Sequence, residues 1–409
     1  MISLLAEFFN NYFYKELEME NFLYFTPTKV YFGKNAEQSL GQAIKDEKAS
    51  KVLVVYGGQS AKKSGLLDRV YAYLGQAGLE YVSLGGVMPN PRLSKVYEGI
   101  ELSRAEKVDF ILAVGGGSVI DTCKAIGSGL CYDGDVWDLY TGKAICGGCT
   151  PLGCILTIAA TGSEMSNGSV ITKDENLLKR SFDSDYCRCK FAIMSPELTY
   201  SLPPYQTSSG SVDIIMHTLE RYFSVSDFAL TDALSASIVK NVITYSKKAL
   251  EKADDYEARA NLMWAGSLSH NGLTGCGTIG DFASHMIEHE LGGMFDVAHG
   301  AGLAAIWGSW ARYVIDVKPE RFAQFAAEMM DIPAGDLSPK EHGLLGIEAL
   351  ENYFRDVNMP TTLHELGIDP TDAQIDELAD KCCDGDTHPV GNFKKLWKED
   401  VKNILLAAR

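Results

Sequence analysis

The sequence predicts an α/β domain built on a parallel sheet, followed by an all-helical domain. In the first half, short apolar runs alternate with helical stretches, and this strand–helix–strand order is typical of parallel strands covered by helices. Beyond about residue 203, strand signals almost disappear and long helical patterns follow one another. The chain has 409 residues, which is enough for two domains with separate cores.

The elements of the first domain follow from apolar runs and glycine signals. The strands have little polar alternation, as expected for a sheet that is buried on both faces. We expect strands at 51–57, 80–87 and 109–118, with helices at 64–78 and 93–107 between them. The helix at 64–78 ends at a glycine, a common C-terminal signal. In the second domain we expect helices at 207–223, 228–251, 254–270 and 280–291.

Two breaks divide the chain. Pro203 and Pro204 form the sharpest breaker in its middle, so we expect the first domain to span 19–202 and the second 203–409. Residues 1–18 are apolar at the start but are interrupted by polar side chains. No basic segment precedes this stretch and no small-residue cleavage site follows it, so neither a signal peptide nor a membrane span is predicted. We interpret it as an N-terminal extension without a catalytic role.

Charge and cysteine content narrow the possible partners and location. The net charge of −17 produces a field that repels nucleic acids and anionic lipid surfaces, so neither is expected as a partner. Ten cysteines are present without a disulfide framework. Cys146 and Cys149 form a C-x-x-C pair but lack a second pair at zinc-ribbon spacing. We therefore expect reduced thiols in a cytoplasmic protein.

A glycine-rich turn follows the third expected strand. Gly115, Gly116, Gly117 and Ser118 lie between an apolar run and a helical pattern. Glycines let the backbone approach a pyrophosphate closely and adopt angles closed to other residues, while a helix N-terminus offers free N–H groups. The turn is not a G-x-G-x-x-G fingerprint, because Ile120 stands at the third glycine position. A purely structural turn is the alternative.

A second segment supports a role for this turn in binding a dinucleotide. Thr157, Thr161 and Ser163 supply hydroxyl groups immediately after another apolar run. An ordinary transition from strand to turn would also explain them.

The strongest chemical signal is a set of candidate metal ligands in the second half. Asp213 and His217 are four residues apart in a helical pattern, so they share one face. His285 and His299 follow later. One carboxylate with three imidazoles suits Fe²⁺ or Zn²⁺. A metal beside a dinucleotide suggests hydride transfer to a carbonyl.

Spacing leaves the fourth ligand open. His285 and His289 are also four residues apart, and with Asp213 and His217 they would complete a set without His299. With Glu288 they spell H-x-x-E-H, the signature of a zinc hydrolase, although a hydrolase has no use for a dinucleotide turn. His270, His342, His364 and His388 have no partner at ligand spacing and are expected at the surface or hydrogen-bonded in the core.

Six motifs, taken together and in order, resemble the iron-containing (group III) alcohol dehydrogenases. The most similar branch is that of bacterial NADP-dependent butanol dehydrogenases and broad-range aldehyde reductases. The motifs are TPTKVYFG (26–33), YGGQSAKKSGLLD (56–68), GGGSVID (115–121), PLGCILTIAATGSE (151–164), LPPYQTSSGSVDIIMHTLERY (202–222) and GDFASHMIEHELGGMFDVAHGAGLA (280–304). The resemblance runs from about Met19 to the C-terminus.

The resemblance implies a fold and a set of site residues. The fold is a Rossmann-like α/β domain followed by a helical domain, as in dehydroquinate synthase-like proteins, and the protein is expected to be a homodimer. The implied metal ligands are Asp213, His217, His285 and His299, which leaves His289 as a catalytic residue near substrate and nicotinamide. The pyrophosphate falls on Gly115, Gly116, Gly117 and Ser118, the nicotinamide side on Thr157, Thr161 and Ser163, and Lys179 near the cofactor.

One departure from the family pattern indicates the preferred cofactor. Relatives that prefer NAD tend to carry an acidic residue after the strand at 51–57, where it holds the ribose 2′-hydroxyl. This chain has Gly57 and Gly58 there, with Ser60, Lys62 and Lys63 close behind. Glycines leave room for a 2′-phosphate, and a hydroxyl or lysine can bind it. We therefore expect NADP(H) to be preferred over NAD(H).

These observations predict a metal-dependent alcohol dehydrogenase or aldehyde reductase. It would transfer hydride between NADP(H) and a small primary alcohol or aldehyde such as butanal. The alternative on the same architecture is a metal-dependent lyase of the dehydroquinate synthase-like superfamily. Its phosphorylated substrates would require a basic cluster near the metal residues, and the sequence shows none there.

Overall fold

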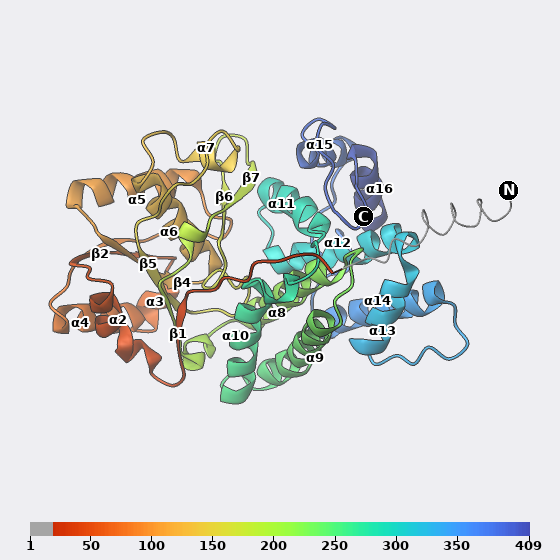
Figure 1. The fold of residues 1–409 in the computed structure, drawn as a ribbon, viewed down its shortest axis with the longest axis horizontal. Helices are drawn as coiled ribbons and strands as arrows, with labels where there is room; N and C mark the ends of the chain where they lie inside the picture. The colour runs from red at the N-terminus through yellow and green to blue at the C-terminus, as the bar shows by residue number, and fades with distance from the viewer. Residues whose placement is uncertain (1–18) are drawn as a thin grey trace.

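The computed structural model describes residues 19–409, and the extension expected at residues 1–18 lies outside this range. Six parallel strands form the main sheet (Figure 1). Their order across the sheet is β1 (Lys29–Phe32), β8 (Phe191–Met194), β5 (Leu152–Leu156), β4 (Phe110–Gly115), β2 (Lys51–Tyr56) and β3 (Glu80–Leu84). The predicted α/β class with a parallel sheet is confirmed.

Helices cover both faces of this sheet, because each central strand is apolar on both sides. Along β2, Val52 and Val54 pack on one face with α2 (Leu40–Asp46) and α4 (Leu66–Gln76). Leu53 and Val55 pack on the other face, with α5 (Leu93–Glu106) and α6 (Gly117–Leu130). Two short helices, α3 (Ser60–Lys63) and α7 (Trp137–Tyr140), lie on the connections.

A two-stranded antiparallel hairpin was not expected from the sequence. Its strands are β6 (Gly168–Thr172) and β7 (Lys179–Asp183). The hairpin packs against α6 and reaches α11 of the helical region. It therefore joins the two halves of the molecule.

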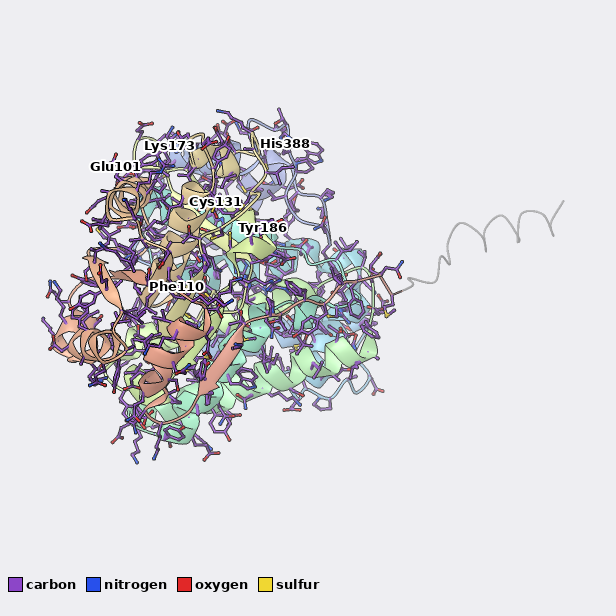
Figure 2. The ribbon with its side chains drawn as sticks, turned by 60° about the vertical axis from the view of Figure 1, so that its left-hand side comes forward. Glu101, Phe110, Cys131, Lys173, Tyr186 and His388 are labelled. Atoms are coloured by element: carbon purple, nitrogen blue, oxygen red, sulfur yellow. The ribbon has the colours of Figure 1, made fainter. Side chains whose placement is uncertain are left out.

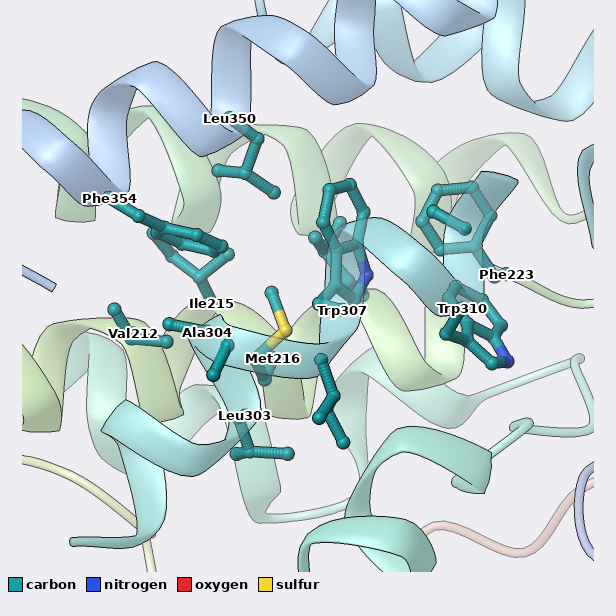
Figure 3. Packing of buried hydrophobic residues seen from close by; sticks show 14 of the residues in the cluster. Val212, Ile215, Met216, Phe223, Leu303, Ala304, Trp307, Trp310, Leu350 and Phe354 are labelled. Atoms are coloured by element: carbon teal, nitrogen blue, oxygen red, sulfur yellow. The ribbon is translucent and has the colours of Figure 1, made fainter. Parts of the chain in front are cut away.

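The second half of the chain is helical, as predicted. Its helices are α8 (Pro204–Tyr222), α9 (Ala229–Glu251), α10 (Tyr256–His270), α11 (Ala283–Phe295), α12 (His299–Val314), α13 (Pro319–Glu328), α14 (Pro339–Asp356), α15 (Asp372–Cys382) and α16 (Lys398–Ala408). Figure 3 shows their core, in which Met216 of α8 and Trp307 of α12 pack beside Phe354 of α14. The first of these helices starts at Pro204, where proline suits the first turn.

Side chains follow this layering in Figure 2. Phe110 lies inside the sheet and is fully buried, whereas His388 lies at the surface with 79% of its side chain exposed. Within residues 19–409, no helix has both the length and the apolar character needed to cross a bilayer.

Candidate active site

A cavity of about 520 Å³ lies where the sheet region meets the helical region. The sheet region contributes the start of α6, the loop after β5 and the hairpin. The helical region contributes the ends of α8 and α10 and the starts of α11 and α12. The second half of the glycine turn, Gly117 and Ser118, lines this cavity together with His217, His285 and His299 of the candidate metal ligands.

Four side chains converge at the helical wall. Asp213, His217, His285 and His299 each offer one ligand atom, and these atoms all lie within 4.8 Å of one another. Oδ1 of Asp213 is 3.3 Å from Nε2 of His217 and 3.7 Å from Nε2 of His299. His289 does not belong to this group.

The donor set fits a divalent cation. Oδ1 of Asp213 and Nε2 of His285 are buried and have no hydrogen-bond partner among residues 19–409. Leaving such atoms unpaired is costly, and a transition metal would satisfy both with its preferred oxygen and imidazole ligands.

Two buried carboxylates hold the far side of two of these histidines. Oε1 of Glu220 lies 3.2 Å from Nδ1 of His285, and Glu288 contacts Nδ1 of His299. A carboxylate on one ring nitrogen fixes the tautomer and directs the other nitrogen toward the ion. Both rings therefore present Nε2 to the cavity.

Burial sets the charge of the group. Burial raises the pKa of Asp213 well above its usual value and lowers the pKa of His217 and His299 well below theirs. His217 and His299 are therefore neutral imidazoles, the form that binds metal ions. A bound cation would reverse the effect on Asp213 by favouring its carboxylate.

His289 and Glu288 occupy positions that do not suit a hydrolase. His289 lines the cavity one turn after His285, its ring centroid 5.9 Å from that of His299. Burial lowers its pKa as well. Glu288 is fully buried between His299 and Nζ of Lys179, which lies 3.2 Å away. It is therefore not free to act as the general base of an H-x-x-E-H site.

The glycine turn has the expected location but a different reason for its glycines. Gly115 ends β4, Gly116 caps α6, and α6 starts at Gly117. None of the three has a positive φ, so the expectation of an unusual backbone is wrong. Instead, a Cβ would collide with Val119 at Gly115, with Ile158 at Gly116 and with Thr161 at Gly117.

Gly117 and Ser118 line the cavity. The first-turn N–H groups of a helix lack intrahelical partners and attract phosphates. The start of α6 can therefore bind a phosphate inside the same cavity that His217, His285 and His299 line.

The other predicted cofactor residues of this cavity differ in whether their polar groups are already hydrogen-bonded within the protein. Thr161 and Lys179 line it. Ser163 lines it too, but its hydroxyl donates to Oδ1 of Asp121 (2.6 Å) and lies 3.0 Å from Nζ of Lys124. Ser163 thus positions the loop through internal hydrogen bonds.

A second cavity of about 610 Å³ lies beside the loop after β5. Ser60 and Thr157 line it, together with Arg69 and Ser195. Thr157 thus lines a different cavity from Thr161 and Ser163, with which it was grouped. Gly57, Gly58, Gly115 and Gly116 line neither cavity.

Sequence reasoning missed two polar side chains at the helical end of the cavity, Arg221 and His270, which line it together with Phe282. Nη1 of Arg221 donates to the carbonyl oxygen of His217 (2.6 Å), and Nη2 lies 3.1 Å from Nδ1 of His270. The spacing of Arg221, four residues after His217 on a helix, was the available signal. His270 is hydrogen-bonded as expected, but it also lines the cavity.

Comparison with known proteins agrees with this geometry. Residues 27–196 match the family model "Iron-containing alcohol dehydrogenase", and residues 207–409 match "Fe-containing alcohol dehydrogenase family, C-terminal". Probable NADH-dependent butanol dehydrogenase 1 of Bacillus subtilis is 39% identical over 95% of this chain and 100% of its own length. The NADPH-dependent aldehyde reductase YqhD of Escherichia coli is 37% identical over 86% of this chain and 90% of its own.

Two solved structures are similar to this chain over nearly its whole length. A structure of NADH-dependent butanol dehydrogenase A from Thermotoga maritima superposes with a TM-score of 0.92 at 38% identity, covering 96% of this chain and 99% of that one. The Escherichia coli YqhD structure gives a TM-score of 0.91 at 35% identity, covering 96% and 100%. The expected family and its oxidoreductase class are confirmed: the chain belongs to the iron-containing alcohol dehydrogenases.

Proposed function

We propose that this protein is a metal-dependent, NADP(H)-preferring alcohol dehydrogenase or aldehyde reductase that acts on short aldehydes such as butanal. The observation that carries the proposal is the shared cavity, which is lined both by the start of α6 and by three of the four convergent side chains, His217, His285 and His299. A bound divalent ion would polarise the carbonyl oxygen, and a bound dinucleotide would supply the hydride for the carbonyl carbon.

The residues of the chain prepare the cavity for this reaction. Asp213 is the one anionic side chain among the four, so a site loaded with a divalent ion keeps about one positive charge, which favours a developing alkoxide. Gly117 and Ser118 would hold the pyrophosphate with their N–H groups. His289 is neutral because burial lowers its pKa, and a ring nitrogen can pass a proton to the alcohol oxygen through water.

Turnover and metal content together test the assignment. We expect NADPH oxidation with butanal when metal-stripped protein is reloaded with Fe²⁺ or Zn²⁺, and no turnover without metal. His299→Ala should lose bound metal, whereas His289→Ala should keep it and lose rate. The reverse pattern would show that His289, and not His299, is the ligand. A cytoplasmic location and a homodimer remain predictions, the second of which light scattering would test.

The preference for NADP(H) rests on the loop after β2. Gly57 and Gly58 leave this position without an acidic side chain, and Ser60, Lys62 and Lys63 beyond it are exposed. Nζ of Lys62 lies 5.1 Å from the ring centroid of Tyr56, at the end of β2. The names of the relatives do not agree on the cofactor: the butanol dehydrogenase of Bacillus subtilis is called NADH-dependent, whereas YqhD is called NADPH-dependent.

Gly57→Asp tests this preference. The nearest atom to a Cβ at Gly57 would be the carbonyl oxygen of Val87 at 3.4 Å, and a Cβ at Gly58 would meet nothing within 4 Å, so a side chain fits. A carboxylate should repel the 2′-phosphate, lowering the ratio of kcat/KM for NADPH to that for NADH by about tenfold or more. Gly75→Asp, at an open position on α4, is the control. An unchanged ratio in Gly57→Asp would remove the basis of the preference.

A further inference from the structure

Arg221 brings a positive charge to the cavity wall without a carboxylate partner. Within residues 19–409 it makes no salt bridge, and the carboxylate of its sequence neighbour Glu220 contacts His285 instead. Its hydrogen-bond acceptors are the carbonyl oxygens of His217 and Ser269 and the ring of His270. Glu220 and Asp183 attract the guanidinium group only through space. Burying a cation whose hydrogen-bond acceptors are all neutral is costly, which favours an anionic ligand in direct contact with it.

The guanidinium group is fixed in place before any ligand arrives. Its central carbon lies 4.8 Å from the centroid of the Phe282 ring, and Nη1 is anchored 2.6 Å from the carbonyl oxygen of His217. Neither Nε nor the second N–H of Nη2 has a partner within the described part of the chain. A planar group with free N–H donors matches the geometry of a carboxylate.

His270 adds a second donor beside it. A guanidinium group has no acceptor, so Nδ1 of His270 must accept the 3.1 Å hydrogen bond from Nη2 of Arg221. The proton of the neutral imidazole is then on Nε2. The ring lines the cavity, with its centroid 4.0 Å from that of the His217 ring.

The distance from this pair to the candidate metal ligands suits a short molecule. Arg221 follows His217 by four residues on α8, and such positions lie about 5–6 Å apart at Cβ. A substrate with its carbonyl at the four convergent side chains would reach Arg221 across a few carbon atoms.

Other charged groups of the cavity leave this end available to an anion. Asp121 accepts from Ser163 and from the backbone N–H of Val170, and Lys179 is paired with Glu288. Asp183 also lines the cavity, but its side chain is exposed and forms no salt bridge with Arg221 in the described region.

We propose that Arg221 and His270 bind a carboxylate, and that the preferred substrates are short aldehydes carrying a carboxylate at the other end. This inference rests on the proposed function, since it names the substrate class of the same site. The reaction is unchanged: a hydride reaches the carbonyl carbon, a proton reaches its oxygen, and the product is a short hydroxy acid with an oxidised dinucleotide.

Paired substrates test the proposal on the metal-loaded enzyme. The probes are 4-oxobutanoate and its methyl ester, which have the same carbonyl and chain but differ in charge. We expect kcat/KM to favour the acid at least tenfold. Arg221→Gln should lower this acid-to-ester ratio by about 10- to 100-fold, and His270→Leu should lower it less. Arg355→Gln, an exposed arginine on α14, should leave the ratio as in the parent.

The metal content of each variant should be measured as well, because Arg221 also contacts the backbone of His217. A variant that has lost metal would lose activity without any change in its preference for the acid. Arg221→Lys keeps the charge without the planar fork, so it should retain part of the preference if Arg221→Gln does not fold. Reduction of butanal and of the ester without preference for the acid, or equal losses for acid and ester in Arg221→Gln, would overturn this inference alone. Failure to reduce any aldehyde with either metal would overturn the proposed function as well.

Discussion

Single buried carboxylates decide how the histidines of the cavity are presented. Glu288 is fully buried and contacts both His299 and Lys179. Two glycines confine it, since a Cβ at Gly302 would lie 2.9 Å from its Cγ and one at Gly292 would lie 3.0 Å from its Oε1. The Glu288 side chain therefore has little freedom, and its contact with Nδ1 holds the His299 ring with Nε2 toward Asp213.

Replacing Glu288 by glutamine should weaken metal binding without removing a ligand. The amide keeps the shape but loses the negative charge that supports the His299 ring, and such changes typically cost 10- to 100-fold in metal affinity. Competition with a chelator of known affinity would measure this. Glu290→Gln, on the same helix as Glu288, is the matched control, because it removes a 2.6 Å ion pair with Arg180 of β7 without touching a candidate ligand. Equal metal affinity in both variants would contradict the role of Glu288.

At the scale of the element, close helix contacts bring the candidate ligands together. A Cβ at Gly300, the second residue of α12, would collide with the carbonyl oxygen of Ser209 on α8. A Cβ at Gly210 would likewise collide with the carbonyl oxygen of Ala159. Small residues at these crossings let α12 and the loop after β5 approach α8 closely. Asp213 and His299 can meet because of this approach.

Gly300→Ala should therefore separate α12 from α8 and weaken metal binding. We expect lower thermal stability together with a metal affinity at least tenfold lower, since metal sites tolerate only small displacements of their ligands. Gly75→Ala is the comparison, because a Cβ there meets nothing within 4 Å. Replacing a helical glycine by alanine should stabilise the folded protein by about 0.5–1 kcal/mol. A Gly300→Ala variant that binds metal like the parent would show that α12 can shift without cost.

Local patterns predicted some of this architecture and could not predict the rest. Apolar runs located the central strands, and helical spacing paired Asp213 with His217. Spacing could not choose between His289 and His299, because α11 ends at Phe295 and Asp296 turns the chain with a φ of 54°. The family resemblance made that choice. The hairpin was missed because β7 is short and polar, so its stability comes from packing on α6 and α11.

For the whole molecule, the cavity couples the two halves of the chain. One wall comes from the start of α6 and the hairpin, and the other from α8, α10, α11 and α12. The salt bridge between Lys179 and Glu288 crosses from one wall to the other. A ligand that contacts both walls binds the folded arrangement and not the unfolded chain, so ligand binding should stabilise the entire protein.

Metal and dinucleotide should each raise the melting temperature, and their effects should be separable. A ligand at a hundred times its Kd stabilises the folded state by about 2.7 kcal/mol through mass action. Asp213→Asn should abolish the shift caused by Zn²⁺, because it removes the only anionic group among the four candidate ligands, and it should keep the shift caused by NADPH. Differential scanning calorimetry with each ligand alone and with both would measure this. If Zn²⁺ still raised the melting temperature of Asp213→Asn, the stabilising metal would be bound elsewhere. If Zn²⁺ shifted only part of the unfolding transition, the two halves of the chain would unfold independently.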